Sequence, residues 1–367
     1  MKRRLFFKKV ATSIPGAIFI STIVPSSVLG NTLVGNKEFD SVGDITTSAS
    51  DYTQSEVPDG LRIGMIGLDT SHCIAFTKTF NDVNAGPEYG GFKVVAACPT
   101  SGSSDIPASI DRLAGFTEQI KQYGVEIVNS IDKLLEKVDV VLLETVDGRK
   151  HLEQAIPVIK AGKRLFIDKP MAASLSDAMI IFNTAQHYNV PVFSSSSLRY
   201  INGIDEVKNG VISGADTFSP AKIEKTHPDL FWYGIHGVEL LFAVMGKGCK
   251  TVSRIAKPDT DIVVGVWEDN RIGTYRGFRA GGKGYGGTVF SEKENKVLGP
   301  YSGYNSLLKE IARFFETGIV PVEPEETLEI LAFMEAANES KKKDGRSVLV
   351  EKIMDKANAK IKGKKYF

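Results

Sequence analysis

The fold class can be inferred first from one stretch, His151-Leu152-Glu153-Gln154-Ala155-Ile156-Pro157-Val158-Ile159-Lys160-Ala161-Gly162-Lys163-Arg164-Leu165-Phe166-Ile167-Asp168-Lys169-Pro170. Apolar residues recur in its first half at i, i+3, i+4 and i+7, the spacing of an amphipathic helix: Leu152, Ala155, Ile156 and Ile159. Residues 164–167 then form a short apolar run that predicts a buried strand. A helix leading into a buried strand is typical of a parallel sheet, because each right-handed crossover needs a helix to return the chain.

The same alternation extends on both sides of this stretch. Leu175, Met179 and Phe182 repeat a helical spacing. Further buried strands are predicted at 61–67, 92–98, 138–143 and 190–193. We therefore predict a Rossmann-like, doubly wound parallel sheet over residues 59–196.

Beyond residue 200 the pattern changes. An apolar stretch at 230–245 precedes short runs at hairpin spacing, at 251–255, 262–267, 271–278, 288–290 and 296–298. Helices are predicted at 305–316 and 325–342, the second introduced by Pro324. We predict an α+β domain with an open, mostly antiparallel sheet over residues 197–345, followed by a basic C-terminal tail at 346–367.

The first 30 residues differ from the rest of the chain. They carry five basic residues and no acid, and an uncharged run follows from Val10 to Asn36. Arg3-Arg4-Leu5-Phe6-Phe7-Lys8 resembles a twin-arginine signal, which carries folded proteins across a membrane. Residues 1–30 therefore predict an export signal and 31–58 a linker. We expect a periplasmic protein, tethered to the membrane if the signal is not cleaved.

Composition excludes several classes of partner and site. The net charge is +1, and removing the five basic charges of the first 30 residues leaves the remainder at −4. A mildly acidic body argues against a nucleic-acid partner. Cys73, Cys98 and Cys249 are odd in number and far apart, so neither a disulfide framework nor a cysteine metal cluster is expected. His227 and His236 match no known spacing for metal ligands, and no metal is predicted.

A loop suited to a dinucleotide follows the first strand, at Gly64-Met65-Ile66-Gly67-Leu68-Asp69-Thr70-Ser71-His72. A dinucleotide site usually has glycine at three positions: one for the tight turn, one for close approach of the pyrophosphate and one for helix packing. Gly67 fills the first place, while Asp69 and His72 stand at the other two. A carboxylate facing a pyrophosphate is repulsive, whereas Thr70 and Ser71 offer donors at a helix start.

The second predicted strand ends without the acid that holds the ribose 2′-hydroxyl of NAD. The sequence there is Cys98-Pro99-Thr100-Ser101-Gly102. Hydroxyls in place of a carboxylate favour NADP over NAD. The alternative is a plain surface turn.

The stretch 151–170 resembles the Gfo/Idh/MocA family, the relatives of glucose-fructose oxidoreductase and inositol dehydrogenase. That family's pattern is a His, a helix ending in Ala-Gly-Lys, a strand and then Glu-Lys-Pro; here Asp168 replaces the Glu. The resemblance covers roughly residues 60–345 in order and proportion and suggests a divergent exported member. It implies a dinucleotide bound by the first domain.

A second match lies at Phe231-Trp232-Tyr233-Gly234-Ile235-His236-Gly237-Val238-Glu239. The family usually has Asp-x-Gly-x-His here, with an Asp three residues after the His. This chain keeps Gly234 and His236, but has Trp232 at the first acid and Glu239 at the second. The indole of Trp232 suggests a platform for the face of a carbohydrate.

The resemblance implies a role for each matching residue. His236 would be the base, because the ordinary histidine pKa of about 6.5 is near working pH. Lys169 would polarise the substrate and relay the proton, since a desolvated ammonium near a cationic ring loses its proton more easily. The alternatives are that His236 has only a structural role and that Lys169-Pro170 forms only a turn. Arg199 would contact substrate oxygens, or form a surface salt bridge. Cofactor contacts are predicted for Gly64, Gly67, Asp69, Thr70, Ser71, His72, Thr145, Asp147, His151, Asp168 and Lys169, and substrate contacts for Arg199, Trp232, Tyr233 and Glu239.

Three functions stay open on the sequence. The first is an NAD(P)-dependent oxidoreductase acting on a sugar or cyclitol, with the cofactor held tightly because no nicotinamide pool exists outside the cytoplasm. The second is an NAD-dependent glycosidase on the same fold. The third is a carbohydrate-binding protein that has lost dinucleotide binding, because fold alone does not fix activity. A homo-oligomer formed through the open sheet is expected.

Overall fold

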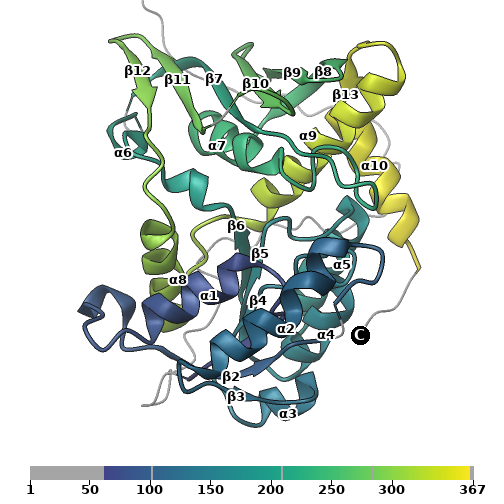
Figure 1. Ribbon diagram of the computed structural model, residues 1–367. Helices are drawn as coiled ribbons and strands as arrows, with labels where there is room; N and C mark the ends of the chain where they lie inside the picture. Colours follow the sequence, from purple (N-terminus) through teal and green to yellow (C-terminus); the bar gives the residue numbers. More distant parts are fainter. Residues whose placement is uncertain (1–61, 101, 208–209, 283, 364–367) are drawn as a thin grey trace, which may run out of the picture. The chain divides into compact units, whose positions relative to one another are not determined.

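The computed structural model describes residues 62–100, 102–207, 210–282 and 284–363 (Figure 1). The predicted export signal at 1–30 and the predicted linker at 31–58 lie outside the described residues. So does the first residue of the strand predicted at 61–67. Within the described part, no helix combines the length and the apolar character needed to cross a bilayer.

The first sheet is parallel throughout and confirms the predicted doubly wound fold. Its strand order is β3-β2-β1-β4-β5-β6. The chain therefore runs outward from β1 in one direction and then, from β4, in the other, and ligands of such sheets bind where the order reverses. The strands are β1 (Arg62–Ile66), β2 (Lys93–Cys98), β3 (Glu126–Ile127), β4 (Val140–Leu143), β5 (Arg164–Asp168) and β6 (Val192–Ser195).

Helices cover both faces of this sheet, as crossover connections require. On one face α1 contributes buried Phe76 and Phe80 to the core, and on the other α4 and α5 contribute Ile159 and Ile181. The predicted amphipathic helix after His151 is α4; of its spaced apolar residues Ala155 and Ile159 are buried, while Leu152 and Ile156 are half-buried. The helices of this part are α1 (Ser71–Phe80), α2 (Pro107–Lys121), α3 (Ile131–Leu135), α4 (His151–Lys160) and α5 (Leu175–His187), with short turns η1 (Pro87–Tyr89) and η2 (Ser197–Tyr200).

The second sheet has seven strands in the order β12-β11-β7-β10-β9-β8-β13. All its pairs are antiparallel except β7 with β10, so the predicted mostly antiparallel sheet is confirmed. The polar sequence of β7, Ser213-Gly214-Ala215-Asp216, gave no strand prediction. The strands are β7 (Ile212–Pro220), β8 (Cys249–Lys257), β9 (Thr260–Trp267), β10 (Ile272–Phe278), β11 (Gly286–Ser291), β12 (Asn295–Leu298) and β13 (Val348–Leu349).

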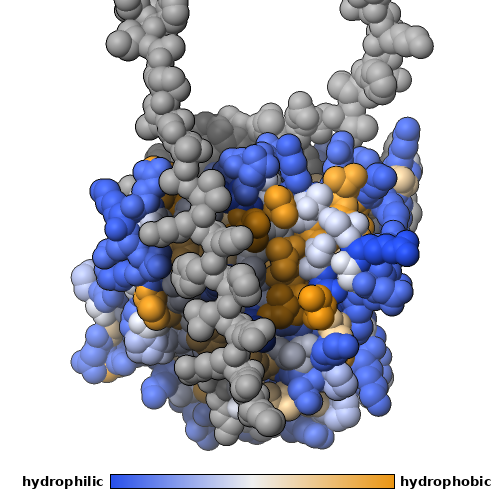
Figure 2. Space-filling model, turned by 90° about the horizontal axis from the view of Figure 1, so that it is seen from above, coloured by the Kyte–Doolittle hydropathy of each residue, from blue (hydrophilic) through white to orange (hydrophobic). Residues whose placement is uncertain are grey.

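Helices cover one face of the second sheet, and among the described residues no helix covers the other. α6 (Ile204–Val207), α7 (Ile235–Met245) and α9 (Pro324–Lys342) accompany it, and α7 and α9 pack on its inner face. Figure 2 looks onto the outer face and shows hydrophobic side chains gathered on it. Ile255 and Ile272 on this sheet are 63% and 52% exposed, which is unusual for residues of this size.

Two late helices return to the first domain. α8 (Asn305–Thr317) lies beside α1 in Figure 1, and Phe314 packs against Phe193 of β6 with ring centroids 4.7 Å apart. Residues 346–363, expected as a basic tail, instead form β13 and α10 (Val350–Ile361), and α10 packs on α5 and α9. The apolar residues of α10, Ile353 and Ala357, are buried, which explains why this segment is ordered despite its lysines.

Candidate functional site

The glycine loop makes the tight turn that the sequence predicts. Gly67 has φ +85°, and a Cβ there would lie 2.4 Å from the backbone nitrogen of Thr145. Only glycine fits this turn without displacing backbone. Gly64 allows close packing, because a Cβ would lie 2.8 Å from Cγ2 of Val138.

Asp69 does not present its carboxylate to a phosphate, contrary to the repulsion expected from the sequence. Its Oδ2 accepts a hydrogen bond from the Ser109 hydroxyl at 2.5 Å, and its Oδ1 accepts one from the Val146 amide at 2.9 Å. The residue is completely buried. Burial raises the pKa of Asp69, and these hydrogen bonds offset part of that shift.

The start of α1 is directed toward the end of β5. The Thr70 hydroxyl accepts a hydrogen bond from the His72 amide and caps the helix, while Ser71 is exposed. The His72 ring stacks on Phe76 at 5.5 Å, and its Nδ1 lies 2.8 Å from Oδ2 of Asp168. Two predicted cofactor residues, 96 positions apart, are thus in direct contact.

Glu144, directly after β4, is a residue of this site that sequence reasoning missed. It is completely buried, and neither carboxylate oxygen has a hydrogen-bond partner. Burial and the neighbouring Asp168 charge raise the pKa of Glu144 well above its usual range. The pKa of Asp168 is lowered, because the charges of His72 and Lys169 outweigh the effect of its burial.

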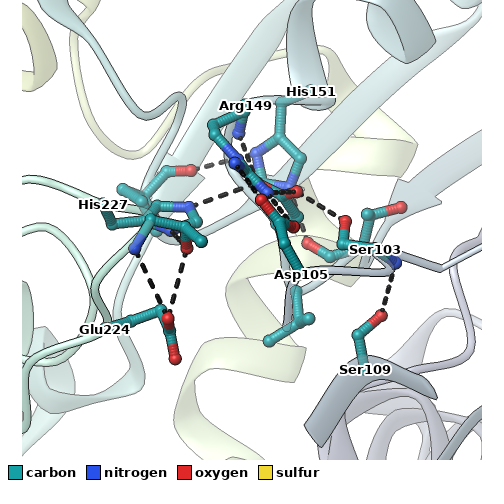
Figure 3. Close-up of polar contacts among 12 residues, drawn as sticks. Ser103, Asp105, Ser109, Arg149, His151, Glu224 and His227 are labelled. Atoms are coloured by element: carbon teal, nitrogen blue, oxygen red, sulfur yellow. Dashed lines mark hydrogen bonds and ion pairs between the residues drawn. The ribbon is translucent and has the colours of Figure 1, made fainter. Parts of the chain in front are cut away.

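Asp147 is the centre of a second polar cluster, of which Ser103, Arg149 and His227 are labelled in Figure 3. Its carboxylate accepts hydrogen bonds from the Ser103 hydroxyl at 2.5 Å and from Arg149, and His227 Nε2 lies 3.3 Å away. Arg149 also pairs with Asp105 at 2.7 Å. Burial opposes ionisation, but the hydrogen bonds from His227, Arg149 and Ser103 together lower the pKa of Asp147. The loop after β2 is thereby tied to the loop after β4.

His151, the first residue of the quoted motif, joins two loops at the sheet edge. Its Nε2 lies 2.7 Å from the carbonyl oxygen of Thr145, and its Nδ1 lies 3.0 Å from that of Pro170. The side chain is buried, and burial lowers its pKa. The histidine therefore holds the Asp168-Lys169-Pro170 segment against the end of β4.

Lys169 and His236 lie close together at the carboxyl end of β5. Lys169 Nζ is 3.9 Å from Oδ2 of Asp168. His236, in the first turn of α7, has its Nδ1 2.7 Å from the Ser196 hydroxyl oxygen. Burial and the nearby charges of Lys169 and His72 hold the pKa of His236 well below its usual range, so the ring is neutral at neutral pH.

Two tyrosines contact the His236 ring, and of these Tyr233 was predicted. The Tyr233 ring centroid lies 5.2 Å from that of His236, and Tyr285 lies 6.0 Å away on an edge. The Tyr301 ring centroid lies 5.4 Å from that of Tyr285, and the Tyr304 ring centroid lies 6.4 Å from that of Tyr301. Tyr285, Tyr301 and Tyr304 lie outside the two motifs from which the site residues were predicted.

The other predicted substrate residues are engaged with protein groups. Arg199 is not a surface salt bridge: it is nearly buried, with Nε 3.0 Å from Glu239 and Nη2 2.5 Å from Glu326. Trp232 packs its ring 5.0 Å from that of His227, beside the Asp147 cluster. The indole therefore adjoins the loops of the first domain.

Several features at the sheet edge fit a dinucleotide. A hollow of about 500 Å³ lies at the end of β2, where the ribose of the adenosine would lie, lined by Cys98, Pro99, Thr100, Ile127, Val128 and Asn129. The Thr100 and Thr145 hydroxyls are buried without a partner. With the Gly67 turn, these groups suit a bound nucleotide.

Comparison with known proteins agrees with this arrangement. Residues 61–196 match the model of the GFO_IDH_MocA family, an oxidoreductase family with an NAD-binding Rossmann fold. The resemblance predicted from residues 151–170 is thereby confirmed. Inositol 2-dehydrogenase of Salmonella typhimurium is 23% identical over 203 residues, which are 52% of this chain and 54% of that protein. The chain spans between 26% and 54% of the length of the curated relatives it matches.

Solved structures share the fold over most of the chain. A probable dehydrogenase from Thermotoga maritima has a TM-score of 0.65 and 19% identity, covering 80% of this chain and all of the other. Scyllo-inositol dehydrogenase from Lactobacillus casei, solved with NAD(H) and scyllo-inositol, has a TM-score of 0.61 and 19% identity, covering 79% and 99%. At this identity the likeness establishes the two-domain fold.

Proposed function

We propose that this chain, whose residues 61–196 carry the NAD-binding Rossmann domain of the Gfo/Idh/MocA oxidoreductases, oxidises a hydroxyl of a sugar or cyclitol. One observation carries the proposal. A neutral His236, oriented by Ser196, lies beside Lys169 at the carboxyl end of β5, where ligands of doubly wound sheets bind.

The proton leaves the substrate through His236. Placing the ring proton on Nδ1, where it is donated to the Ser196 hydroxyl oxygen, leaves Nε2 as the base. The proton of the substrate hydroxyl moves to Nε2, and the electron pair of the O–H bond forms the C=O bond. The hydrogen on the same carbon leaves as a hydride, with both electrons of the C–H bond. The Lys169 ammonium stabilises the negative charge that develops on the oxygen. The dinucleotide, when bound, supplies the acceptor for the hydride.

The chain's own residues would hold that cofactor. The Gly67 turn brings backbone close to the pyrophosphate, and the free Thr145 hydroxyl offers a donor beside it. The hollow beside Thr100 would take the adenosine ribose, and its lining has no carboxylate, which favours NADP. The tie between Arg149 and Asp105 would slow release, in keeping with a tightly held cofactor.

A polyhydroxylated substrate suits the surroundings of His236. Tyr233, Tyr285 and Tyr301 bring aromatic faces for the C–H side of a sugar ring and hydroxyls for its oxygens. Related structures hold scyllo-inositol or myo-inositol with NAD(H). Both points support a sugar or cyclitol as the substrate class.

The test is to purify the protein, denature it and assay the supernatant for NAD(H) and NADP(H). We expect NADP(H) to be released, and inositols or sugars to change the nicotinamide absorbance of the native protein. Release of sugar from aryl glycosides with no net redox change would indicate the glycosidase instead. A protein that neither contains nor binds either nucleotide would refute the proposal and favour the non-redox alternative.

We also propose export by the twin-arginine route, on the strength of residues 1–30. Replacing both Arg3 and Arg4 by Lys should leave the protein in the cytoplasm of an expressing bacterium. Fractionation with a cytoplasmic marker measures this. Unchanged periplasmic delivery of the double variant would point to the ordinary secretion route.

A further inference from the structure

Three side chains with metal-binding atoms meet where three elements of the first domain end or begin. Glu144 follows β4, Asp168 is the last residue of β5, and His72 lies in the first turn of α1. One donor atom from each lies within 4.8 Å of the others. His72 and Asp168 were predicted as cofactor contacts, but their contact with Glu144 could not be predicted, because the three residues are 72 and 24 positions apart along the chain.

The protein neighbours of this group leave the Glu144 carboxyl without a hydrogen-bond partner. Glu144 is completely buried, and both of its oxygens lack a hydrogen-bond partner. Asp168, beside it, already has His72 at 2.8 Å and Lys169 at 3.9 Å. A buried carboxylate with no partner is costly, and a second carboxylate nearby adds repulsion. A cation between the two acids would remove both costs.

We propose that His72, Glu144 and Asp168 bind a divalent transition-metal ion. One imidazole nitrogen and two carboxylate oxygens form a ligand set used for Zn²⁺, Mn²⁺ and Fe²⁺, with further positions left open. Two donors about 2.1 Å from a tetrahedral ion lie about 3.4 Å apart, so a pair separated by the full 4.8 Å has to close by about 1.4 Å, which side-chain rotation can supply. The ion replaces the hydrogen bond between His72 and Asp168.

The surroundings suit such a site. The His72 ring is held between Phe76 and Tyr304, which fixes the direction of its nitrogens. Its side chain is 12% exposed, so an ion has a path from solvent. Lys169 and His236 lie on the same side, so an open coordination position would face the hydroxyl groups of a polyol substrate.

The experiment uses the full-length protein, freed of metals by a chelator, with no nucleotide or substrate present. Mn²⁺ is added, bound ion is counted by the loss of the free-ion EPR signal, and the melting temperature is recorded at each concentration. We expect one Mn²⁺ per chain and a melting temperature that rises with Mn²⁺. Zn²⁺ should displace the bound Mn²⁺.

Glu144→Gln is the decisive variant, with the exposed Glu118→Gln as its matched control. The amide keeps the shape of Glu144 but cannot ionise, and burial already disfavours the ionised carboxylate, so without metal the variant should melt at or above the wild-type temperature. With Mn²⁺ the order should reverse, since the variant should bind at least about tenfold more weakly. His72→Gln provides a second loss-of-ligand variant if Glu144→Gln fails to fold.

Either of two results would overturn the proposal: a wild-type protein that binds no Mn²⁺ or Zn²⁺, or variants at Glu144 and His72 that bind as well as the wild type. Because the readout needs neither cofactor nor turnover, it is independent of the proposed oxidoreductase activity. A protein that fails the redox test can still pass this one.

Discussion

At the residue scale, Asp69 shows how a departure from a motif is absorbed by the fold. The carboxylate at the place of the second glycine is turned inward and held by Ser109 and Val146. An asparagine can keep both contacts, because its Oδ1 accepts from the Val146 amide and its Nδ2 donates to the Ser109 hydroxyl oxygen, which reverses the direction of that hydrogen bond. The charge itself opposes the folded state, since burial raises the pKa of Asp69.

Asp69→Asn should therefore make stability less dependent on pH. A carboxyl whose pKa is raised on folding stabilises the folded state fully below its unfolded value of about 3.9 and loses that contribution as the pH rises through the folded value. The asparagine does not titrate, so we expect the variant to equal or exceed the wild-type free energy of unfolding at neutral pH. Urea denaturation at a series of pH values from below about 3.9 to neutral measures the free energy of unfolding, with exposed Asp111→Asn as the control. A variant that is clearly less stable at neutral pH would show that the charged form is favoured.

His236 gives a second prediction, in the pH dependence of turnover. The ring is faced by Lys169, His72, Asp168 and two tyrosines, and burial with the two cations lowers its pKa. A base must be unprotonated, so kcat/KM should fall only below the ordinary histidine value of about 6.5. An acid limb above that value would contradict the assignment.

Replacing the ring tests the same role directly. His236→Gln should lower kcat roughly 10²- to 10⁴-fold while nucleotide binding is kept. The exposed His187→Gln should leave both unchanged. Ser196→Ala should shift the acid limb of kcat/KM, because the hydroxyl orients the ring without touching the reacting atoms.

The sequence identified those site residues that lie within local motifs. Asp168, Lys169 and His236 could be named because the order of residues around them matches a family pattern. Glu144 and Ser196 could not, because their roles come from contacts across the sheet edge; His236 and Ser196 are 40 positions apart. A single sequence carries no signal for such a contact.

At the scale of elements, α8 illustrates the same limit. Its helix was predicted to within a residue of its end, but the partner of its apolar face was not. Phe314 packs on Phe193, and Phe315 packs near Phe92 at 5.7 Å, so the helix covers the parallel sheet of the first domain. The amphipathic pattern predicts that a face is buried, and leaves open which sheet buries it.

Phe314→Ala should thus destabilise the first domain, although it lies more than 100 residues beyond it. The side chain is completely buried, and we expect a loss of about 3–5 kcal/mol in the free energy of unfolding. Denaturation followed by fluorescence and by far-UV circular dichroism measures it. Arg313→Ala, on the exposed side of the same turn, should cost less than about 0.5 kcal/mol. A cost for Phe314→Ala as small as this would show that α8 is not part of that core.

At the scale of the whole molecule, the open sheet face is the remaining feature without a partner in the described chain. Its strands alternate buried and half-exposed residues, and the outward row of β9 is Ile262, Val264 and Val266. Exposed Ile255 and Ile272 lie on the flanking strands β8 and β10. An apolar sheet face of this kind is typical of an interface between protein chains.

We expect this face to join copies of the chain, as the sequence predicted. A stable interface buries at least about 1,000 Å² in total, which the outer face of a seven-stranded sheet can supply. Val264→Arg places a charge at its centre, between Ser253 of β8 and Thr274 of β10. The variant should be a monomer by light scattering while the wild type is a dimer or larger, because desolvating an unpaired guanidinium opposes association. Ile223→Arg, exposed in a loop outside the sheet, should keep the wild-type mass. A monomeric wild-type protein, or a Val264→Arg variant of unchanged mass, would show that this face does not mediate assembly.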